Sequence, residues 1–377
     1  MNRTPIKCIL PPHMLKQIAT NGTDAQKKMA VRNLVASSRM RGQRQDAREL
    51  LALSRTLVSD IKKRTIYNAQ QGNSLPGILA RQEGDQPVQD QAVNEAYDFS
   101  GATYDLFKNI YGRNSMDGNG MKLDSTVHYQ KGYDNAFWNG NQMVYGDGDE
   151  DLPPDQQLFN RFTKAIDVVG HELTHGVTQF EANLTYFQQS GALNESFSDV
   201  FGSLVKQYFL QQSALEADWI IGEGLLTANV AGKGIRSMKA PGTAYNDPIL
   251  GKDPQPDHMK DYVNTSSDNG GVHINSGIPN YAFFVAATEI GGNAWEKTGL
   301  IWYRTLKDKL KFDTNFQQCA SLTWQVAGEN FGTGSLEQKA VRKGWSAVGI
   351  DATLSGTGGS TSNGCLPTAI QKLGQLR

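Results

Sequence analysis

The pentapeptide His171-Glu172-Leu173-Thr174-His175 constrains the fold of this 377-residue chain more than any other feature. It lies in a stretch whose apolar residues recur at helical spacing, at Ile166, Val169, Leu173 and Val177. Two histidines four residues apart share one face of a helix, so both imidazoles can reach one metal ion, and the glutamate between them can reach a water at that ion. So short a match also arises by chance with both histidines facing solvent. A third ligand is therefore needed before a site is predicted.

A candidate third ligand follows twenty residues later, in the helix-compatible run Gly-Ala-Leu-Asn-Glu-Ser-Phe-Ser-Asp at 191–199. Catalytic zinc takes three protein ligands and keeps one position for water, which makes Glu195 the third ligand of one Zn2+ per chain. Asp199, one helical turn further on, can hydrogen-bond the outer nitrogen of a ligand histidine. The alternative is a solvated acidic helix face, which the upstream motif disfavours. The residues at 176–181, Gly-Val-Thr-Gln-Phe-Glu, exclude the zinc peptidases that carry H-E-x-x-H-x-x-G-x-x-H.

Composition and charge place the chain among soluble globular proteins. It is 38% hydrophobic and 20% charged with a formal net charge of −1, so we expect no nucleic-acid partner. The chain has no stretch of about 18 apolar residues, so we expect no membrane insertion. Three widely spaced cysteines, Cys8, Cys319 and Cys365, cannot build a disulfide framework. The first 15 residues lack the apolar core of a secretory signal, so we expect synthesis in the cytoplasm and secretion by a non-classical route.

Patterning divides the chain into four regions and predicts an α+β fold. Residues 1–55 are basic, with ten Lys/Arg against three Asp/Glu in the first 50, and have helical patterns at 25–35 and 47–58. We expect this segment to dock on the rest of the chain; the alternative is a floppy tail. Residues 56–165 carry short β-type runs at 64–67, 126–129 and 142–145. Helical patterns dominate 166–351, at 163–180, 192–212, 279–289, 294–306 and 315–331. Residues 352–377 form a tail of unknown role, with a Gly/Ser/Thr linker at 355–363.

Residues from about 64 to 351 resemble the thermolysin family of metallopeptidases. The runs that carry the resemblance are Asn-Ala-Phe-Trp at 135–138, the His-Glu-Leu-Thr-His box, 191–199, Arg-Ser-Met at 236–238 and Asp-Asn-Gly-Gly-Val-His-Ile-Asn-Ser-Gly at 268–277. Residues 8–15 resemble the short propeptide of the protealysin group. The resemblance implies a strand-rich N-terminal domain, a helical C-terminal domain and a cleft between them. It also implies a monomeric, neutral zinc metalloendopeptidase made as a self-inhibited, autoprocessed precursor, whose partners are protein or peptide substrates and its own propeptide in cis.

The resemblance assigns catalytic roles to four residues. Glu172 takes a proton from the attacking water and passes it to the leaving amine. His273, oriented by Asp268, stands with Tyr186 around the developing oxyanion. A buried or turn histidine is the alternative for His273, although the glycine pair before it suits close backbone approach.

Substrate contacts follow from the same resemblance. The side chain of Asn135, the backbone at Ala136 and Trp138, and Arg236 anchor the peptide backbone. The residue after the scissile bond enters a pocket lined by Phe159, Phe162, Val168 and Ile235. Because all four are apolar, we predict cleavage before large hydrophobic residues. Without the resemblance, ordinary core packing is the better explanation of these four residues.

The block on the precursor is assigned to the docking of Pro11, Pro12, His13, Met14 and Leu15, with cleavage near residues 50–60. A thiolate of Cys8 on the zinc is the alternative, since thiolate is a strong zinc ligand. A catalytically silent binding protein of the same fold is the competing function. That function is disfavoured because every catalytic position holds the required residue type.

Calcium sites of the family are matched only in part. Asp167, Asp218 and Glu223 occupy matching acidic positions, but Lys206 stands where the cluster should be completed. Lys233 stands at a second calcium position. An ammonium among carboxylates can replace a cation, so we predict a reduced or absent calcium requirement. The Asp-Gly-Asp turn at 147–149 lacks ligand spacing and is predicted to be a turn.

Overall fold

The computed structural model describes residues 7–37 and 61–354. The helix predicted at 47–58, the cleavage region near 50–60, the linker at 355–363 and Cys365 lie outside these residues. The predicted helix at 25–35 is confirmed, since residues 24–37 are helical. In the described part of the chain, no helix combines the length and the apolar character needed to cross a membrane.

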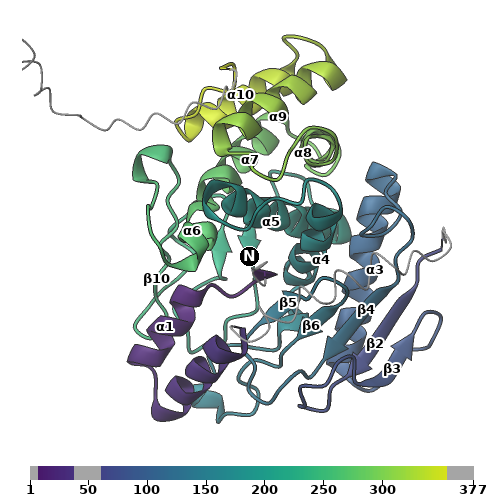
Figure 1. Cartoon of the computed structure of the whole chain (residues 1–377), viewed down its shortest axis with the longest axis vertical. Coiled ribbons are helices and arrows are strands. Elements are labelled where there is room, and N and C mark those ends of the chain that lie inside the picture. The colour runs from purple at the N-terminus through teal and green to yellow at the C-terminus, as the bar shows by residue number, and fades with distance from the viewer. Residues whose placement is uncertain (1–6, 38–60, 355–377) are drawn as a thin grey trace, which may run out of the picture.

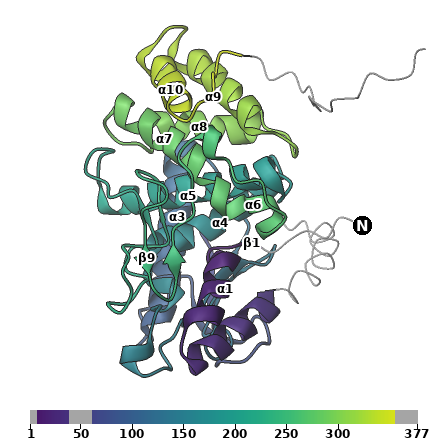
Figure 2. The same ribbon diagram turned by 90° about the vertical axis from the view of Figure 1, so that its left-hand side faces the viewer.

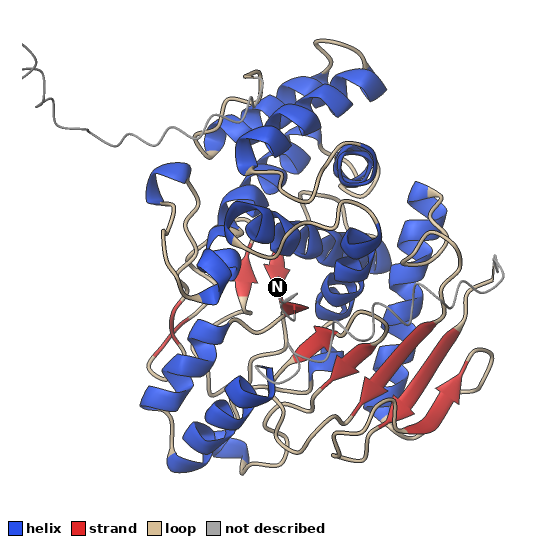
Figure 3. Ribbon diagram, in the orientation of Figure 1, coloured by secondary structure: helices blue, strands red, loops and turns tan. Residues whose placement is uncertain are grey.

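A six-stranded mixed sheet forms one half of the body, seen at the lower right of Figure 1 and in red in Figure 3. Its strand order is β1-β5-β6-β4-β2-β3, with bounds Lys7–Cys8, Ala136–Trp138, Met143–Tyr145, Leu123–Val127, Arg64–Asn68 and Ile78–Gln82. The β2–β4 and β4–β6 pairs are parallel, whereas β1–β5, β5–β6 and β2–β3 are antiparallel. The N-terminal segment thus supplies the strand beside β5, at one edge of the sheet.

A long helix, α3 (Gln91–Tyr111), packs against this sheet. Asp90 caps its first turn by accepting the N–H groups of Ala92 and Val93, and Gly112 ends it at φ 67°, in the left-handed region that glycine tolerates. The prediction of short strands over 56–165 missed this helix. The aspartate cap, the glycine stop and the apolar spacing between them were the signals for it.

Helices form the other half of the body, in the middle and at the top of Figures 1 and 2. Their bounds are α4 Ile166–Phe180, α5 Gln188–Leu210, α6 Asp268–Asn275, α7 Gly277–Ile290, α8 Lys297–Asp308, α9 Phe316–Phe331 and α10 Leu336–Ala347. Two small antiparallel pairs lie between α5 and α6: β7 (Ile220–Ile221) with β8 (Arg236–Ser237), and β9 (Asn246–Asp247) with β10 (Gly251–Lys252). The predicted helical stretches of the C-terminal half are confirmed, with α6 and α10 in addition.

The two central helices, α4 and α5, approach each other closely because glycine lies at their contact. A Cβ atom on Gly202 of α5 would lie 2.5 Å from the carbonyl oxygen of Asp167 in α4, which no larger side chain could accommodate. This contact brings the His-Glu-x-x-His face of α4 against the Glu195 face of α5.

The N-terminal segment lies on the body, as the sequence predicted. After β1 it forms α1 (Pro12–Asn21), which starts with proline at its first position, and then the helix at 24–37. Met14, Leu15 and Ile18 of α1 are buried. Figures 1 and 2 show both helices in purple against the lower part of the body.

Candidate metal centre

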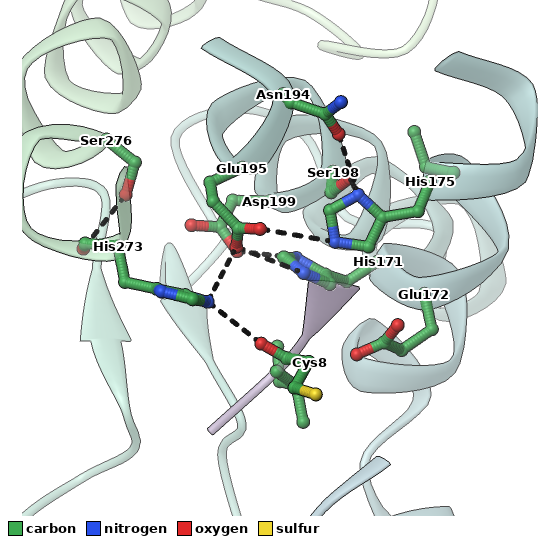
Figure 4. Close-up of polar contacts among 12 residues, drawn as sticks. Cys8, His171, Glu172, His175, Asn194, Glu195, Ser198, Asp199, His273 and Ser276 are labelled. Atoms are coloured by element: carbon green, nitrogen blue, oxygen red, sulfur yellow. Dashed lines mark hydrogen bonds and ion pairs between the residues drawn. The ribbon is translucent and has the colours of Figure 1, made fainter. Parts of the chain in front are cut away.

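Three side chains from α4 and α5 converge at the centre of the molecule. His171, His175 and Glu195 are fully buried, and their ligand atoms all lie within 4.8 Å of one another. Figure 4 shows the two imidazoles and the carboxylate pointing toward a common point. The helical spacing read from the sequence therefore produces the predicted convergence.

The chemistry of these atoms fits a zinc ion. Nε2 of His171 and Oε2 of Glu195 lie 3.5 Å apart, and within the described part of the chain neither buried atom has a hydrogen-bond partner. Polar atoms buried in this way are costly unless a cation or a proton satisfies them. Two imidazole nitrogens and one carboxylate are the ligand set of a catalytic zinc.

The outer nitrogens of both histidines are held by further side chains. Nδ1 of His171 lies 2.8 Å from Oδ1 of Asp199, as predicted. Nδ1 of His175 lies 2.8 Å from both Oδ1 of Asn194 and Oγ of Ser198. These contacts direct both Nε2 atoms to the centre. Sequence reasoning missed Asn194 and Ser198, although their positions one residue before and three residues after Glu195 place them on neighbouring parts of the same helix.

Glu172 lies between the two histidines on α4 and is fully buried. Its Oε2 accepts the backbone N–H of Trp138 at 2.9 Å. This hydrogen bond ties the carboxylate to β5, and Figure 4 shows the Glu172 side chain below the two histidines.

His273 reaches the centre from α6. Its Nδ1 lies 2.6 Å from Oδ1 of Asp268, and its Nε2 lies 3.2 Å from the hydroxyl of Tyr186, which in turn donates to Glu195. Burial alone would lower the pKa of His273, but the carboxylates of Asp268 and Glu195 outweigh burial and raise it to about 9. A charged imidazole donates from both nitrogens, which suits it to stabilise negative charge on an oxygen.

The glycine pair before His273 shapes this part of α6. Gly270 and Gly271 have φ values of 83° and 78°, in the left-handed region, and a Cβ atom on Gly271 would lie 2.8 Å from the side chain of Asn275. The kink lets the Asp268 carboxylate accept the backbone N–H of His273 at 2.9 Å. Aspartate and histidine are therefore fixed relative to each other by the backbone itself.

Arg236 and Asp199 form a fully buried pair beside the histidines. Nε and Nη2 of Arg236 donate to the two carboxylate oxygens of Asp199 at 2.8 and 2.7 Å, and Asn280, which the sequence reading did not identify, donates to the same carboxylate at 2.9 Å. Burial would raise the pKa of Asp199, but Arg236 and His171 lower it to about 2. Asp199 therefore stays ionised and orients both Arg236 and His171.

The N-terminal segment passes this centre as a strand on β5. Cys8 pairs with Phe137 in antiparallel register. The N–H of Ile9 donates to the carbonyl of Ala136 at 3.3 Å, and Nη1 of Arg236 donates to the carbonyl of Ile9 at 3.0 Å. The backbone N–H and carbonyl of Ile9 are thus bound by two residues, Ala136 and Arg236, that the resemblance predicted to bind the substrate backbone.

Two further contacts extend this pattern on either side of Ile9. The N–H of Leu10 donates to Oδ1 of Asn135 at 3.0 Å. The carbonyl oxygen of Cys8 lies 2.9 Å from Nε2 of His273, and Figure 4 shows it directed toward His273. The backbone of residues 8–10 therefore meets Asn135 and His273, two more of the side chains expected to contact substrate.

The blocking contacts begin upstream of the residues predicted for them. Pro11 to Leu15 were expected to fill the cleft, but Pro12 starts a helix and leaves the strand pairing to residues 7–9. Pro12 and Leu15 line a small pocket together with Asn135 and His273. His13 turns aside, with its Nε2 3.1 Å from the hydroxyl of Tyr245.

The Cys8 thiol lies apart from the metal centre. Its side chain packs in a buried cluster with Tyr129, Tyr133, Phe137 and Val144. In Figure 4 its sulfur projects away from the two histidines. The thiolate alternative finds no support in this geometry, because strand pairing turns the side chain to the face of Phe137.

The four predicted pocket residues, Phe159, Phe162, Val168 and Ile235, are buried in the main hydrophobic core of the described residues. Ile9 is also fully buried and belongs to this core. An aliphatic side chain at the position of Ile9 is therefore well matched to its surroundings.

Lys206 gathers the three acidic residues expected at a calcium position. Its ammonium lies 2.5 Å from Asp218, 2.7 Å from Glu223 and 3.7 Å from Asp167. Burial would lower the pKa of Lys206, but these carboxylates raise it above its ordinary value. Lys233, by contrast, is exposed.

Comparison with known proteins agrees with the arrangement of side chains at this centre. A sequence model described as the thermolysin metallopeptidase catalytic domain matches residues 26–179, and one described as the alpha-helical domain matches residues 182–350. The chain belongs to the thermolysin family of metallopeptidases.

Individual relatives place the peptidase within this family. It is 49% identical over 358 residues to an extracellular metalloprotease of Pectobacterium carotovorum subsp. carotovorum, covering 93% of this chain and 98% of that protein. It is 48% identical over 349 residues to protease PrtS of Photorhabdus sp. (strain Az29), covering 91% of this chain and 92% of that protein. Among solved structures, the precursor of protealysin, a metalloproteinase from Serratia proteamaculans, aligns with a TM-score of 0.81 at 51% identity, covering 91% of this chain and 99% of that chain.

These matches confirm three expectations from the sequence. The peptidase is a protealysin-like member of the thermolysin family, it has the two-domain α+β fold of that family, and it is a metalloendopeptidase. The family implies zinc as the metal, which agrees with the ligand set at the centre.

Proposed function

We propose that the peptidase hydrolyses peptide bonds before large hydrophobic residues, using one Zn2+ held by His171, His175 and Glu195, and that residues 1–55 block this activity in a precursor that processes itself. When bound, zinc supplies a Lewis acid that acidifies water and polarises the carbonyl of the scissile bond. The protein supplies the remaining chemistry.

Glu172 acts as the general base and then as the general acid. Its carboxylate lies between the two histidines and faces the edge of β5 through the Trp138 N–H. From this position it accepts a proton from water and delivers it to the amine nitrogen that leaves. Burial of the carboxylate excludes bulk water that would compete for the same proton.

His273 and Tyr186 stabilise the oxygen that becomes negative. The 2.9 Å contact between Nε2 of His273 and the Cys8 carbonyl is the distance expected of such a donor. Tyr186 stands 3.2 Å from the same nitrogen and can turn its hydroxyl to the oxyanion. Asp268 keeps the imidazole charged and oriented.

The course of residues 8–10 carries the proposal. Their backbone engages four groups at once: Asn135, the Ala136 carbonyl, Arg236 and His273. A substrate strand that used these groups would place the residue equivalent to Ile9 just after the scissile bond, and we propose that its side chain enters a pocket of Phe159, Phe162, Val168 and Ile235, which share the main hydrophobic core with Ile9. This placement supports both the preference for hydrophobic residues and the blocking role of the segment.

The pairing of the N-terminal segment with β5 limits how self-processing near residues 50–60 can begin. While residues 7–10 hold the edge of β5, a second stretch of the same chain cannot pair there. The first cut therefore requires either release of the segment or a second peptidase molecule whose β5 edge is open. The two routes differ in concentration dependence, because only the second becomes faster as the precursor is concentrated.

Glu172→Gln tests the proposal. The substitution keeps the side-chain shape and the zinc ligands but removes the base, so the purified variant should retain zinc, lose peptide hydrolysis and remain uncut. Continued self-processing in this variant would contradict the assignment. A catalytically silent binding protein would show no hydrolysis in the parent either.

Two expectations extend beyond the reaction. Lys206 supplies charge where relatives of the family hold calcium, so we propose that calcium adds little to stability. Secretion is proposed because a relative is named an extracellular metalloprotease.

A further inference from the structure

A pair of buried carboxyl groups lies where the helix at 24–37 meets the body. Asp134 directly precedes Asn135 and the start of β5, and Asp149 follows β6 in the Asp-Gly-Asp turn. The turn is bonded to the strand segment, since the N–H of Gly148 donates to the carbonyl of Tyr133 at 3.3 Å. The two carboxyls, 3% and 2% exposed, therefore belong to one interface between the segment and the body.

Asn33 of the N-terminal helix covers this pair. Its Nδ2 donates to Oδ2 of Asp134 at 2.9 Å, across 101 residues of sequence. The other oxygen, Oδ1, is buried and has no hydrogen-bond partner in the described ranges 7–37 and 61–354. Asp149 uses Oδ2 to accept the N–H groups of Leu158 and Phe159 at 2.8 and 3.0 Å. The carboxyls of Asp134 and Asp149 lie within hydrogen-bond reach of each other, so a proton shared between them can supply the donor that the buried Oδ1 otherwise lacks.

Among the described residues, the charges around the pair do not neutralise it. Asp151 adds a further negative charge, which Lys131 meets only at 3.9 Å. Arg32 is the positive charge that acts on Asp134, and it is exposed. Burial first, and then the Asp149 carboxyl, raise the pKa of Asp134 well above its ordinary value, while burial raises the pKa of Asp149 to about 6. Two ionised carboxylates in this position would repel each other in a medium of low polarity.

We infer that the Asp134–Asp149 pair keeps one proton while Asn33 covers it, and that loss of this proton to solvent at rising pH loosens the helix at 24–37 from the body. The inference rests on the proposed blocking role of residues 1–55 and adds a regulator to it. Because the same segment supplies β1, a loosened helix also weakens the strand that holds the β5 edge. The precursor is then most firmly closed in acid and opens more readily toward neutral and alkaline pH.

The direction of the effect follows from proton linkage. When the helix leaves, water reaches the pair and the pKa of its carboxyls returns toward the ordinary value of about 4. Docking therefore takes up a proton, and the docking constant falls by up to about tenfold per pH unit between that value and the raised one. Packing between uncharged groups at the same contact, such as Met29 against Gly132, does not depend on pH.

Amide hydrogen exchange of the full-length Glu172→Gln precursor, which should stay uncut, measures this linkage. The protection of amides at 24–37 is compared with that of α3 in the same sample from about pH 5 to about pH 8, so that the intrinsic pH dependence of exchange cancels. We expect the relative protection to fall by up to about tenfold per pH unit. The double variant Asp134→Asn/Asp149→Asn, which removes both buried carboxyls, should remove the slope, whereas the matched control Asp151→Asn, at an exposed site, should keep it.

Flat protection in the parent, or an unchanged slope in the double variant, would overturn the inference. Should the double variant not fold, Asp134→Asn alone leaves one of the two carboxyls and should confine the slope to a narrower pH range than in the parent; the same slope over the same range would contradict the inference. The outcome is independent of the zinc chemistry. An incorrect base assignment appears instead as continued self-cutting of the Glu172→Gln precursor.

Discussion

Replacement of Lys206 by methionine tests the reading of the acidic cluster. The Lys206 side chain is 9% exposed, and its ammonium contacts three carboxylates. The exposed fraction of the side chain is 1% for Asp167, 33% for Asp218 and 58% for Glu223. Methionine keeps much of the length of the side chain but removes the charge. Asp167 is then left buried beside another carboxylate without a cation.

The magnitude of the effect depends on this burial. Breaking a buried ion pair by removing one partner costs about 3–5 kcal/mol of unfolding free energy, and exposed pairs cost less than about 1 kcal/mol. Because Asp167 is buried and the other two acids are partly solvated, we expect a loss of about 3 kcal/mol. Millimolar calcium should recover part of this loss in Lys206→Met while leaving the parent unchanged, since the vacated position then resembles a carboxylate calcium site.

Urea unfolding of the uncut Glu172→Gln precursor, with and without calcium, measures both effects. Lys233→Met is the matched control, because Lys233 is exposed, and it should change the free energy of unfolding by less than about 0.5 kcal/mol. A parent whose unfolding midpoint rises markedly with calcium would refute the reasoning. So would a Lys206→Met variant as stable as the control.

Three further outcomes are expected. His128 lies 2.8 Å from Asp147 and 2.9 Å from Asp90, and chiefly the Asp147 hydrogen bond raises its pKa to about 9. This stabilisation is complete below the unfolded pKa of about 6.5 and is lost as pH rises to about 9. Over that pH range, the free energy of unfolding of the parent, measured in urea, should fall by roughly 1–2 kcal/mol more than that of His128→Gln, a value that allows for partial exposure of the site. Equal losses in the two proteins would contradict this. Ile9→Asp places a charge in the hydrophobic core and should loosen the block, so the variant should cut itself and a peptide substrate sooner than the parent does. A variant that stays folded, uncut and inactive would argue against the block. Asn194→Leu should weaken zinc about 10–100-fold in a chelator competition, and unchanged affinity would show that its contact with His175 is dispensable.

The sequence predicted the centre well because its determinants are local. Helical spacing fixes His171 and His175 on one face, and a second helix with Glu195 and Asp199 one turn apart can meet that face in few ways. The approach of the two helices, however, depends on Gly202, whose role becomes visible only once the partner helix is placed.

Long-range contacts were the part that the sequence could not predict. Nothing in residues 7–10 indicates that they pair with β5 136–138, since register is set by packing between segments about 130 residues apart. The same holds for Asn33 and Asp134, and for Asn280 on the Asp199 carboxylate. Helix α3 was missed for a different reason, because the Gly- and Asn-rich runs around it dominated the reading of that region.

The most direct test of the central claim is to locate the metal. Anomalous diffraction at the zinc absorption edge, from crystals of the purified peptidase, should show one ion per chain at about 2.0–2.2 Å from Nε2 of His171, Nε2 of His175 and the Glu195 carboxylate, beside Glu172. Zinc-dependent hydrolysis by a peptidase whose ion lies elsewhere, or a zinc-loaded chain with no peak between these three side chains, would contradict the account.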